Sequence, residues 1–273
     1  MNNSDKAGEA YWTSFWDQLA LPKMVDISHK SISNYDFRKI NEVYTRTLSP
    51  SPSQKLLELG CGNSVFLSYF HKEFGYDVYG LDYSELGCKQ TERILARDNV
   101  KGTIVQGDIF NPPSELIGQF DVVCSFGVLE HFEDSTATVK AFSKFLKPGG
   151  TLITTVPYLK GATGLLQKIM NKPVYDIHVL MDREDLKGFI KNAGLNLTYC
   201  EYHLPISFGV TLEQSGDHKV SFFPIKKLIL KSLQVLSKVC WFIDDRLFKL
   251  PVLPFFTAGI ISVATLDKNI NAE

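Results

Sequence analysis

The stretch Glu58-Leu59-Gly60-Cys61-Gly62-Asn63 decides how the rest of this chain is interpreted. It ends an apolar run that begins at Leu56, and a helical pattern starts just after it at Val65. Glycines let a backbone turn sharply and approach a ligand closely. The helix that follows offers unpaired N–H groups and the positive end of its dipole to an anionic group. The stretch therefore predicts a strand-to-helix turn with a nucleotide-type site, although glycines also serve plain turns.

Short apolar runs alternate with helical patterns from Lys55 onward. Strand, helix, strand, helix in this rhythm predicts parallel βαβ units with right-handed crossovers. The predicted strands are residues 56–59, 78–81, 103–105, 120–124, 151–156, 195–199 and 259–266. We therefore expect an α/β fold with one doubly wound, Rossmann-like sheet.

Helical patterns lie before this sheet and interrupt its second half. Apolar residues recur at helical spacing between positions 37 and 48, and the proline-containing stretch 49–53 then breaks the pattern. We predict an N-terminal helical cap (1–48) and one main domain (49–273). Within that domain we expect a helix over 182–192, which ends at Gly194, and a helical insertion (205–255) before the last strand.

Residues 225–243 form an amphipathic pattern inside the predicted insertion. The apolar side comprises Ile225, Leu228, Ile229, Leu233, Leu236, Val239, Cys240 and Ile243, and the lysines on the other side are Lys227, Lys231 and Lys238. Such a helix suits a peripheral membrane contact or a lipid-linked substrate. More often it covers a core or a subunit interface, such as a homodimer contact, which is the interpretation we favour.

Composition and charge narrow the function classes. Lysine and arginine total 29 against 30 acidic residues, so the chain lacks the basic excess typical of nucleic-acid binders, and no nucleic-acid partner is expected. The five cysteines are odd in number and never form a C-x-x-C pair, so we expect neither a disulfide scaffold nor a bound metal. The N-terminus shows no apolar stretch behind a basic start, which favours a cytoplasmic address.

Acidic residues follow the second and third predicted strands. Asp82 stands where a carboxylate can accept hydrogen bonds from ribose hydroxyls, or alternatively where it would cap the helix that begins near Ser84. Asp108 can accept from an exocyclic amine, and Ile109 can cover an adenine face. Because the carboxyl ends of parallel strands meet at one crevice, we expect these residues to line a common ligand site.

Several motifs in a fixed order give the chain a family resemblance. They are Leu57-Glu58-Leu59-Gly60-Cys61-Gly62, Gly80-Leu81-Asp82-Tyr83-Ser84, Gly107-Asp108, Phe120-Asp121-Val122-Val123, Val128-Leu129-Glu130-His131 and Leu146-Lys147-Pro148-Gly149-Gly150-Thr151-Leu152. Over residues 55–157 this set resembles the class I S-adenosylmethionine (SAM) dependent methyltransferases, in the style of the ubiquinone and menaquinone biosynthesis enzymes and of other small-molecule methyltransferases.

The resemblance implies a seven-stranded, mostly parallel sheet with an antiparallel last strand, and a set of contacts to SAM. Glu58, Gly60, Cys61 and Gly62 would surround the methionine part of SAM, with backbone near Ser125 and Phe126 at its amino group. Asp82 would hold both ribose hydroxyls with Tyr83 beside the adenine, and Asp108 and Ile109 would take the adenine. The rival interpretation, a dinucleotide dehydrogenase, would place a third glycine where this chain has Val65.

Methyl transfer from a sulfonium can proceed largely by positioning, so a general base is optional. If the acceptor is a hydroxyl, His131 and His178 are the candidate bases, although a structural role for each stays open, and His203 is a weaker candidate. The insertion favours a small acceptor that is apolar, quinone-like or linked to a saccharide or lipid. The alternative function is a SAM-binding partner protein without catalysis.

Aromatic residues are concentrated near the start of the chain. They are Tyr11, Trp12, Phe15, Trp16 and Tyr35. They could form a lid over SAM, and a helix packed on the sheet edge explains them equally well.

Overall fold

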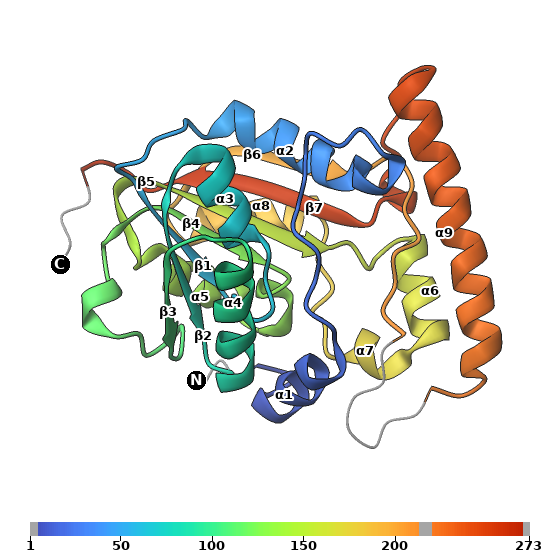
Figure 1. Ribbon diagram of the computed structural model, residues 1–273, viewed down its shortest axis with the longest axis horizontal. Helices are drawn as coiled ribbons and strands as arrows, with labels where there is room; N and C mark the ends of the chain where they lie inside the picture. The colour runs from blue at the N-terminus through green and yellow to red at the C-terminus, as the bar shows by residue number, and fades with distance from the viewer. Residues whose placement is uncertain (1–4, 213–219, 270–273) are drawn as a thin grey trace.

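The computed structural model describes residues 5–212 and 220–269 (Figure 1). Part of the predicted cap (1–4) and part of the predicted insertion (213–219) lie outside the described residues. The helices are α1 (Glu9–Gln18), α2 (Tyr35–Thr47), α3 (Phe66–Phe74), α4 (Glu85–Arg97), α5 (Ser135–Ser143), α6 (Ala162–Met170), α7 (Lys172–Asp176), α8 (Arg183–Asn192) and α9 (Phe223–Arg246). Short 3₁₀ turns occupy Ile32–Asn34, Ser114–Leu116, Leu129–His131 and Pro254–Phe256.

Seven strands form one sheet in the order β3-β2-β1-β4-β5-β7-β6. They are β1 (Lys55–Leu59), β2 (Asp77–Asp82), β3 (Gly102–Gln106), β4 (Phe120–Phe126), β5 (Leu146–Pro157), β6 (Asn196–His203) and β7 (Gly259–Thr265). The first five pair in parallel, and β7 runs antiparallel to both β5 and β6. The predicted doubly wound α/β fold is confirmed, with α9 preceding the last strand.

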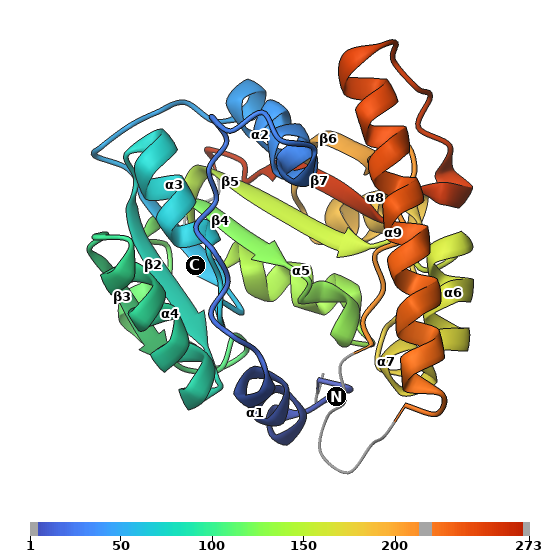
Figure 2. The same cartoon turned by 45° about the vertical axis from the view of Figure 1, so that its right-hand side comes forward.

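Both faces of the sheet are covered, which explains the continuous apolar runs in its strands. Leu57 and Leu59 of β1 pack with α5 and α8 on one face. Leu56, which precedes Leu57, packs on the other face with α2 and α3. Figures 1 and 2 show these two helical layers on either side of the sheet.

Local signals set the ends of the helices. Ser84 caps α4 by accepting from Gly87 N at 3.2 Å. Asp182 caps α8, and Asp185 returns a bond to the Asp182 N–H in a capping box. The predicted helix 182–192 is therefore confirmed, with Asp182 as its cap.

The strand order reverses direction between β1 and β4. From β1 the chain builds outward to β2 and β3, and then returns to add β4 and β5 on the other side. Such a switch point leaves a crevice at the carboxyl ends of the two central strands. The glycine stretch 60–62 follows β1 at this place.

Helix α9 extends the predicted amphipathic helix, but its orientation differs from the interpretation that its apolar side covers a core. Only Leu230, Ser237 and Asp244 of α9 are buried. Leu228 is 67% exposed and Val235 is 60% exposed. The apolar side therefore faces outward, because the contact side is made by a different line of residues, two of which are polar.

Candidate functional site

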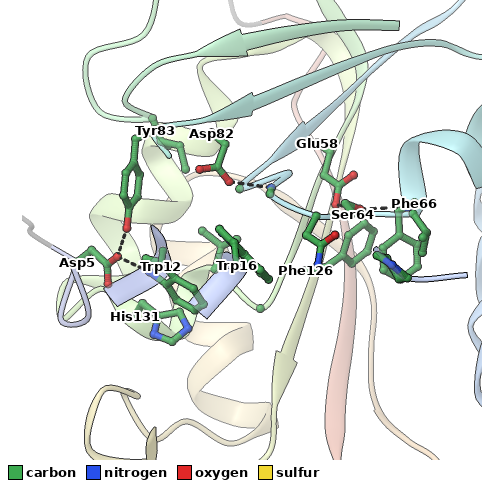
Figure 3. Close-up of a pocket in the computed structure, with 18 of the residues that line it drawn as sticks. Asp5, Trp12, Trp16, Glu58, Ser64, Phe66, Asp82, Tyr83, Phe126 and His131 are labelled. Atoms are coloured by element: carbon green, nitrogen blue, oxygen red, sulfur yellow. Dashed lines mark hydrogen bonds between the residues drawn. The ribbon is translucent and has the colours of Figure 1, made fainter. Parts of the chain in front are cut away.

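A cavity lies at the carboxyl ends of β1, β2 and β4, and residues of α1 close one side of it (Figure 3). It is lined by Asp5, Trp12, Trp16, Pro22, Glu58, Gly60, Gly62, Asn63, Ser64, Val65, Phe66, Asp82, Tyr83, Ile109, Phe126, Gly127, Val128, His131 and Phe132. The cavity thus occupies the switch point at which the sequence predicted a ligand site.

Two glycines of the turn after β1 are required by its geometry. Gly60 has a φ of +70°, and a Cβ there would lie 2.5 Å from a methyl group of Val128. A Cβ on Gly62 would lie 2.8 Å from the indole nitrogen of Trp16. Cys61 between them is fully buried, and its sulfur lies against Gly80 of β2. The backbone of this turn therefore faces the cavity, whereas the Cys61 side chain belongs to the core.

Asp82 fastens the glycine turn to the end of β2. Its Oδ2 accepts from Gly62 N and its Oδ1 from Ser84 N, both at 2.8 Å. Burial raises the pKa of the Asp82 carboxyl to about 6. Because Ser84 caps α4, the helix-cap interpretation of Asp82 is wrong. Each carboxylate oxygen can accept a second hydrogen bond, so the Asp82 carboxylate can also serve a ligand in the cavity.

Glu58 places a second buried carboxyl group at the same wall (Figure 3). Its Oε1 accepts from Ser64 Oγ at 2.6 Å. Its Oε2 is buried and has no hydrogen-bond partner among the described residues. Burial raises the pKa of the Glu58 carboxyl to about 8. A buried polar oxygen without a partner on a cavity wall is suited to accept a hydrogen bond from a ligand.

The variant Glu58→Gln is expected to be more stable than the wild type above pH 8 when no ligand is bound. The folded-state pKa of about 8 lies above the ordinary value of 4.5, so the folded protein holds an extra proton between these values. The free energy of unfolding of the wild type therefore falls as the pH rises through this range, by up to about 1.4 kcal/mol per pH unit from this group. A glutamine side chain has nearly the same shape as that of Glu58 and carries no charge at any of these pH values, so the variant avoids this loss of stability.

Thermal unfolding of the two proteins at pH 5 and at pH 9 checks this expectation. The two melting temperatures should be close at pH 5, and the variant should melt higher at pH 9. Glu130 is also buried with a raised pKa, but it titrates in both proteins, so the difference isolates Glu58. A variant that melts below the wild type at pH 9 would show that the Glu58 carboxylate is stabilised by a partner in the folded chain.

Asp5 joins the N-terminal segment to the cavity, and no sequence pattern predicted this contact. The Asp5 Oδ2 accepts from Trp12 Nε1 at 2.8 Å and also from the hydroxyl of Tyr83. A backbone bridge pairs Asp5 with Phe132. Asp5 is one polar residue in a polar segment, and its partner Tyr83 is 78 positions away. No local pattern marks such a contact.

The aromatic residues near the start of the chain divide into two groups. Trp12 and Trp16 line the cavity, with ring centroids 5.6 Å apart. The side chain of Gln90 on α4 donates to the Trp16 carbonyl at 2.8 Å and holds α1 in place. Tyr35 instead is buried against Trp241 and donates to Asp244 at 2.7 Å. Tyr35 therefore has no part in a lid.

The remaining predicted contacts also divide into two groups. Ile109 and Phe126 line the cavity, and the Phe126 ring lies 4.1 Å from that of Phe66. Asp108 and Ser125 are absent from its lining. The Asp108 carboxylate accepts from Phe110 N at 2.9 Å, and Ser125 is fully buried.

His131 lines the cavity, whereas His178 is absent from its lining. The two ring centroids are 4.7 Å apart. Nδ1 of His131 lies 3.2 Å from the Ile177 carbonyl oxygen, and Nδ1 of His178 lies 2.5 Å from that of Val174. Nδ1 of each ring must carry the proton to make these bonds, which leaves Nε2 as an acceptor.

Burial and the neighbouring His178 lower the pKa of His131 to about 4, so His131 is neutral at pH 7. A neutral imidazole can accept a proton at Nε2, which in His131 lies 3.9 Å from Oε1 of Glu130. The weaker candidate, His203, is absent from the cavity lining, and its Nε2 lies 3.2 Å from Asp36. The fold thus favours His131 over the other two histidines.

Glu130, His131 and His178 bring three potential metal ligands within 4.8 Å of one another. One carboxylate and two imidazoles form a donor set that suits a divalent transition metal. No bound metal was predicted from the sequence. Glu130 and His131 are adjacent in the motif 128–131, but only the fold adds His178 to them.

A doubly wound sheet in this strand order, with an acidic, glycine-lined cavity at its switch point, is the architecture of a class I SAM-dependent methyltransferase. The chain matches the profile of the methyltransferase domain family over residues 32–199, which is more than half of its length. It belongs to this family, and the resemblance found in the sequence is confirmed.

Ubiquinone biosynthesis O-methyltransferases are among the curated relatives of this chain. The chain is 28% identical to that of Acinetobacter baumannii (strain AYE) over 153 residues, which cover 53% of this chain and 64% of that enzyme. It is 25% identical to that of Thiobacillus denitrificans over 221 residues, which cover 74% of this chain and 94% of that enzyme. The alignment with the first relative thus spans less than two thirds of its length.

Solved methyltransferase structures share the fold. Geranyl diphosphate C-methyltransferase from Streptomyces coelicolor A3(2), solved with Mg²⁺, geranyl diphosphate and S-adenosyl-L-homocysteine, superposes with a TM-score of 0.57 at 14% identity, covering 92% of this chain and 95% of that one. A putative sarcosine dimethylglycine methyltransferase from Galdieria sulphuraria gives a TM-score of 0.59 at 14% identity, with 96% and 99% coverage. At this identity the likeness establishes the fold alone.

Proposed function

We propose that this protein transfers the methyl group of SAM to a small, apolar acceptor. The observation that carries the proposal is the pair of buried carboxyl groups, Glu58 and Asp82, on either side of the glycine turn at the switch point. Family membership supports the same donor.

The residues of the cavity suit SAM. The unpartnered Glu58 Oε2 can accept from the ammonium group of its methionine part. The Asp82 carboxylate can accept from the ribose hydroxyls, and Tyr83 and Ile109 offer apolar surface for the adenine. The backbone near Phe126 is the proposed partner of the methionine part. Val65 is the N-cap residue of α3 and stands where a dinucleotide enzyme would have its third glycine, so SAM suits the turn better than NAD does.

Bound SAM supplies an electrophilic methyl group on a sulfonium. The chain positions the acceptor, excludes water and removes a proton. Trp12 and Trp16 of α1 close one side of the cavity, which favours transfer in a dry site. We propose that His131 accepts the acceptor's proton at Nε2, and that His178 keeps the His131 ring in place.

The acceptor class follows from the cavity wall. Phe66, Phe126, Val128 and Phe132 give part of this wall an apolar surface. The relatives are named for ubiquinone biosynthesis, and one structural neighbour was solved with geranyl diphosphate. We propose an acceptor that is quinone-like or carries a lipid tail, and that presents a hydroxyl group to His131.

A calorimetric titration with S-adenosylhomocysteine (SAH), with NAD as the control ligand, tests the cofactor. We expect SAH to bind and NAD not to bind. Binding of NAD alone would overturn the proposal. The alternative function, a partner protein without catalysis, predicts SAH binding without methyl transfer to any hydroxylated quinone precursor or lipid-linked acceptor.

We also propose a cytoplasmic address. All five cysteines are free thiols, and four of them are buried, which suits a reducing compartment. Fractionation of cells that express the full chain tests this address, and recovery outside the cytoplasm and its membranes would contradict it.

A further inference from the structure

Helix α9 carries an apolar stripe that faces away from the protein. Its buried residues Leu230, Ser237 and Asp244 are seven positions apart. Two positions before each buried residue stands a large apolar one, namely Leu228, Val235 and Phe242. Two positions correspond to roughly 200° around a helix, so these three side chains lie on the side opposite the buried residues. Each of them is at least half exposed. In Figures 1 and 2, α9 stands at the edge of the molecule.

The stripe continues into neighbouring segments. After α9, the large apolar residues Leu247, Phe248 and Phe255 are each more than half exposed. On the neighbouring helix α6, the side chains of Leu165 and Ile169 are 58% and 69% exposed. Met170 of α6 and Leu230 of α9 pack in one small cluster, so the two helices are neighbours. These residues and the stripe of α9 together form what we call the apolar patch.

Positive charge borders this patch. Lys227, Lys231 and Lys238 lie along one flank of α9, and none of them has an ion-pair partner within the described ranges 5–212 and 220–269. The two acidic residues of α9 are already engaged: Asp244 accepts from Tyr35 at 2.7 Å, and Asp245 pairs with Arg38 at 2.8 Å. The exposed charge of α9 is therefore positive, although the whole chain has a net charge of -1.

We propose that the apolar patch binds the surface of an anionic lipid bilayer. A helix with an apolar face and a lysine flank lies in the plane of a bilayer, with its lysines at the anionic headgroups. No helix among the described residues is long and apolar enough to cross a membrane, so α9 would lie on the bilayer. A symmetric dimer fits less well, because it would bring the patch against itself without acidic partners for the lysines.

The same surface would bring the cavity end of the sheet toward the lipid. Strand β5 points toward α6 and α9 in both views (Figures 1 and 2). The cavity opens at the carboxyl ends of the neighbouring strands. The proposal concerns binding and does not depend on methyl transfer, so the two can fail separately.

Sedimentation of the full chain with phosphatidylcholine vesicles, with and without phosphatidylglycerol, tests the proposal. We expect the protein to sediment with the phosphatidylglycerol vesicles, and less so as salt is added. Replacing Lys227, Lys231 and Lys238 together with glutamine should weaken this binding on the order of a hundredfold, because each lysine near an anionic surface contributes about fivefold. Equal binding to both vesicle types would contradict the role of the lysines.

A second variant tests the stripe itself. Leu228→Asp combined with Val235→Asp should weaken vesicle binding about tenfold or more without loss of SAH binding, because both side chains point away from the core. The matched control is Ile117→Asp, which places an acid at an exposed apolar position outside the patch and should leave binding unchanged. Absence of vesicle binding by the wild type, or a wild-type dimer that the Leu228→Asp variant separates into monomers, would overturn the proposal.

Discussion

Replacing Asp82 with alanine is expected to weaken SAH binding by about a hundredfold or more. The proposed bonds from ribose hydroxyls to the buried carboxylate are charge-assisted, and each is worth about 1.5–3 kcal/mol. The substitution also frees the glycine turn, because Gly62 N loses its 2.8 Å acceptor. Calorimetric titration measures the loss, and an affinity within threefold (~0.7 kcal/mol) of the wild type would refute the ribose assignment.

Asp121→Ala is the matched control for this loss. Asp121 also fastens two segments, since it accepts from Lys55 N at 2.9 Å and pairs with Lys147 at 2.7 Å, but it lies at the opposite end of the sheet. We expect Asp121→Ala to reduce stability and to leave SAH affinity unchanged.

The SAH affinity of the wild type should fall below about pH 6, because the Asp82 carboxylate becomes protonated there.

Replacing His131 with alanine is expected to lower turnover by about 10²–10⁴-fold when the acceptor is a hydroxyl. The Nε2 of His131 is the proposed proton acceptor, and alanine leaves no base at that wall. SAH affinity should stay close to that of the wild type. Because the pKa of His131 is lowered to about 4, turnover of the wild type at saturating SAM and acceptor should stay level from pH 8 down to about pH 5. A loss of turnover centred near pH 6.5 would contradict the assignment.

Two further measurements separate the possible roles of this histidine. His203→Ala is the matched control, because His203 lies outside the cavity and contacts Asp36, and it should leave turnover unchanged. Treatment with a chelator should also leave turnover unchanged if His131 acts as a base. Loss of turnover on chelation, restored by a divalent metal, would assign Glu130, His131 and His178 to a metal site instead.

The fold and the core of the site were predictable because their signals are local. The glycine turn 60–62 sits between an apolar run and a helical pattern, and Asp82 ends the next strand. In a parallel sheet, strand ends converge whatever the loops between them do. The cavity accordingly contains Glu58, Gly60, Gly62, Asp82, Tyr83, Ile109, Phe126 and His131.

The contacts that could not be predicted join distant parts of the chain. Asp5 reaches Tyr83 across 78 positions, and His178 reaches His131 across 47. Side-chain packing determines whether a residue points toward a cavity or away from it, and spacing along the chain does not encode this packing. This applies to Cys61, Asp108 and Ser125. These positions are where the predicted and observed linings differ.

Hydrophobic periodicity and the order of glycines and acidic residues were sufficient to predict the sheet, its switch point and the family of this protein. Each of these features depends on residues that are close in the sequence or that end neighbouring strands. The orientation of α9 was not accessible in this way. An amphipathic pattern indicates only that a helix has an apolar side and a polar side. Two hydrogen bonds between distant residues determine which side of α9 packs on the protein. Tyr35 donates to Asp244, 209 positions away, and Ser237 accepts from Phe208 N at 3.0 Å. Satisfying buried polar groups outweighed burial of the apolar stripe, which leaves that stripe on the surface.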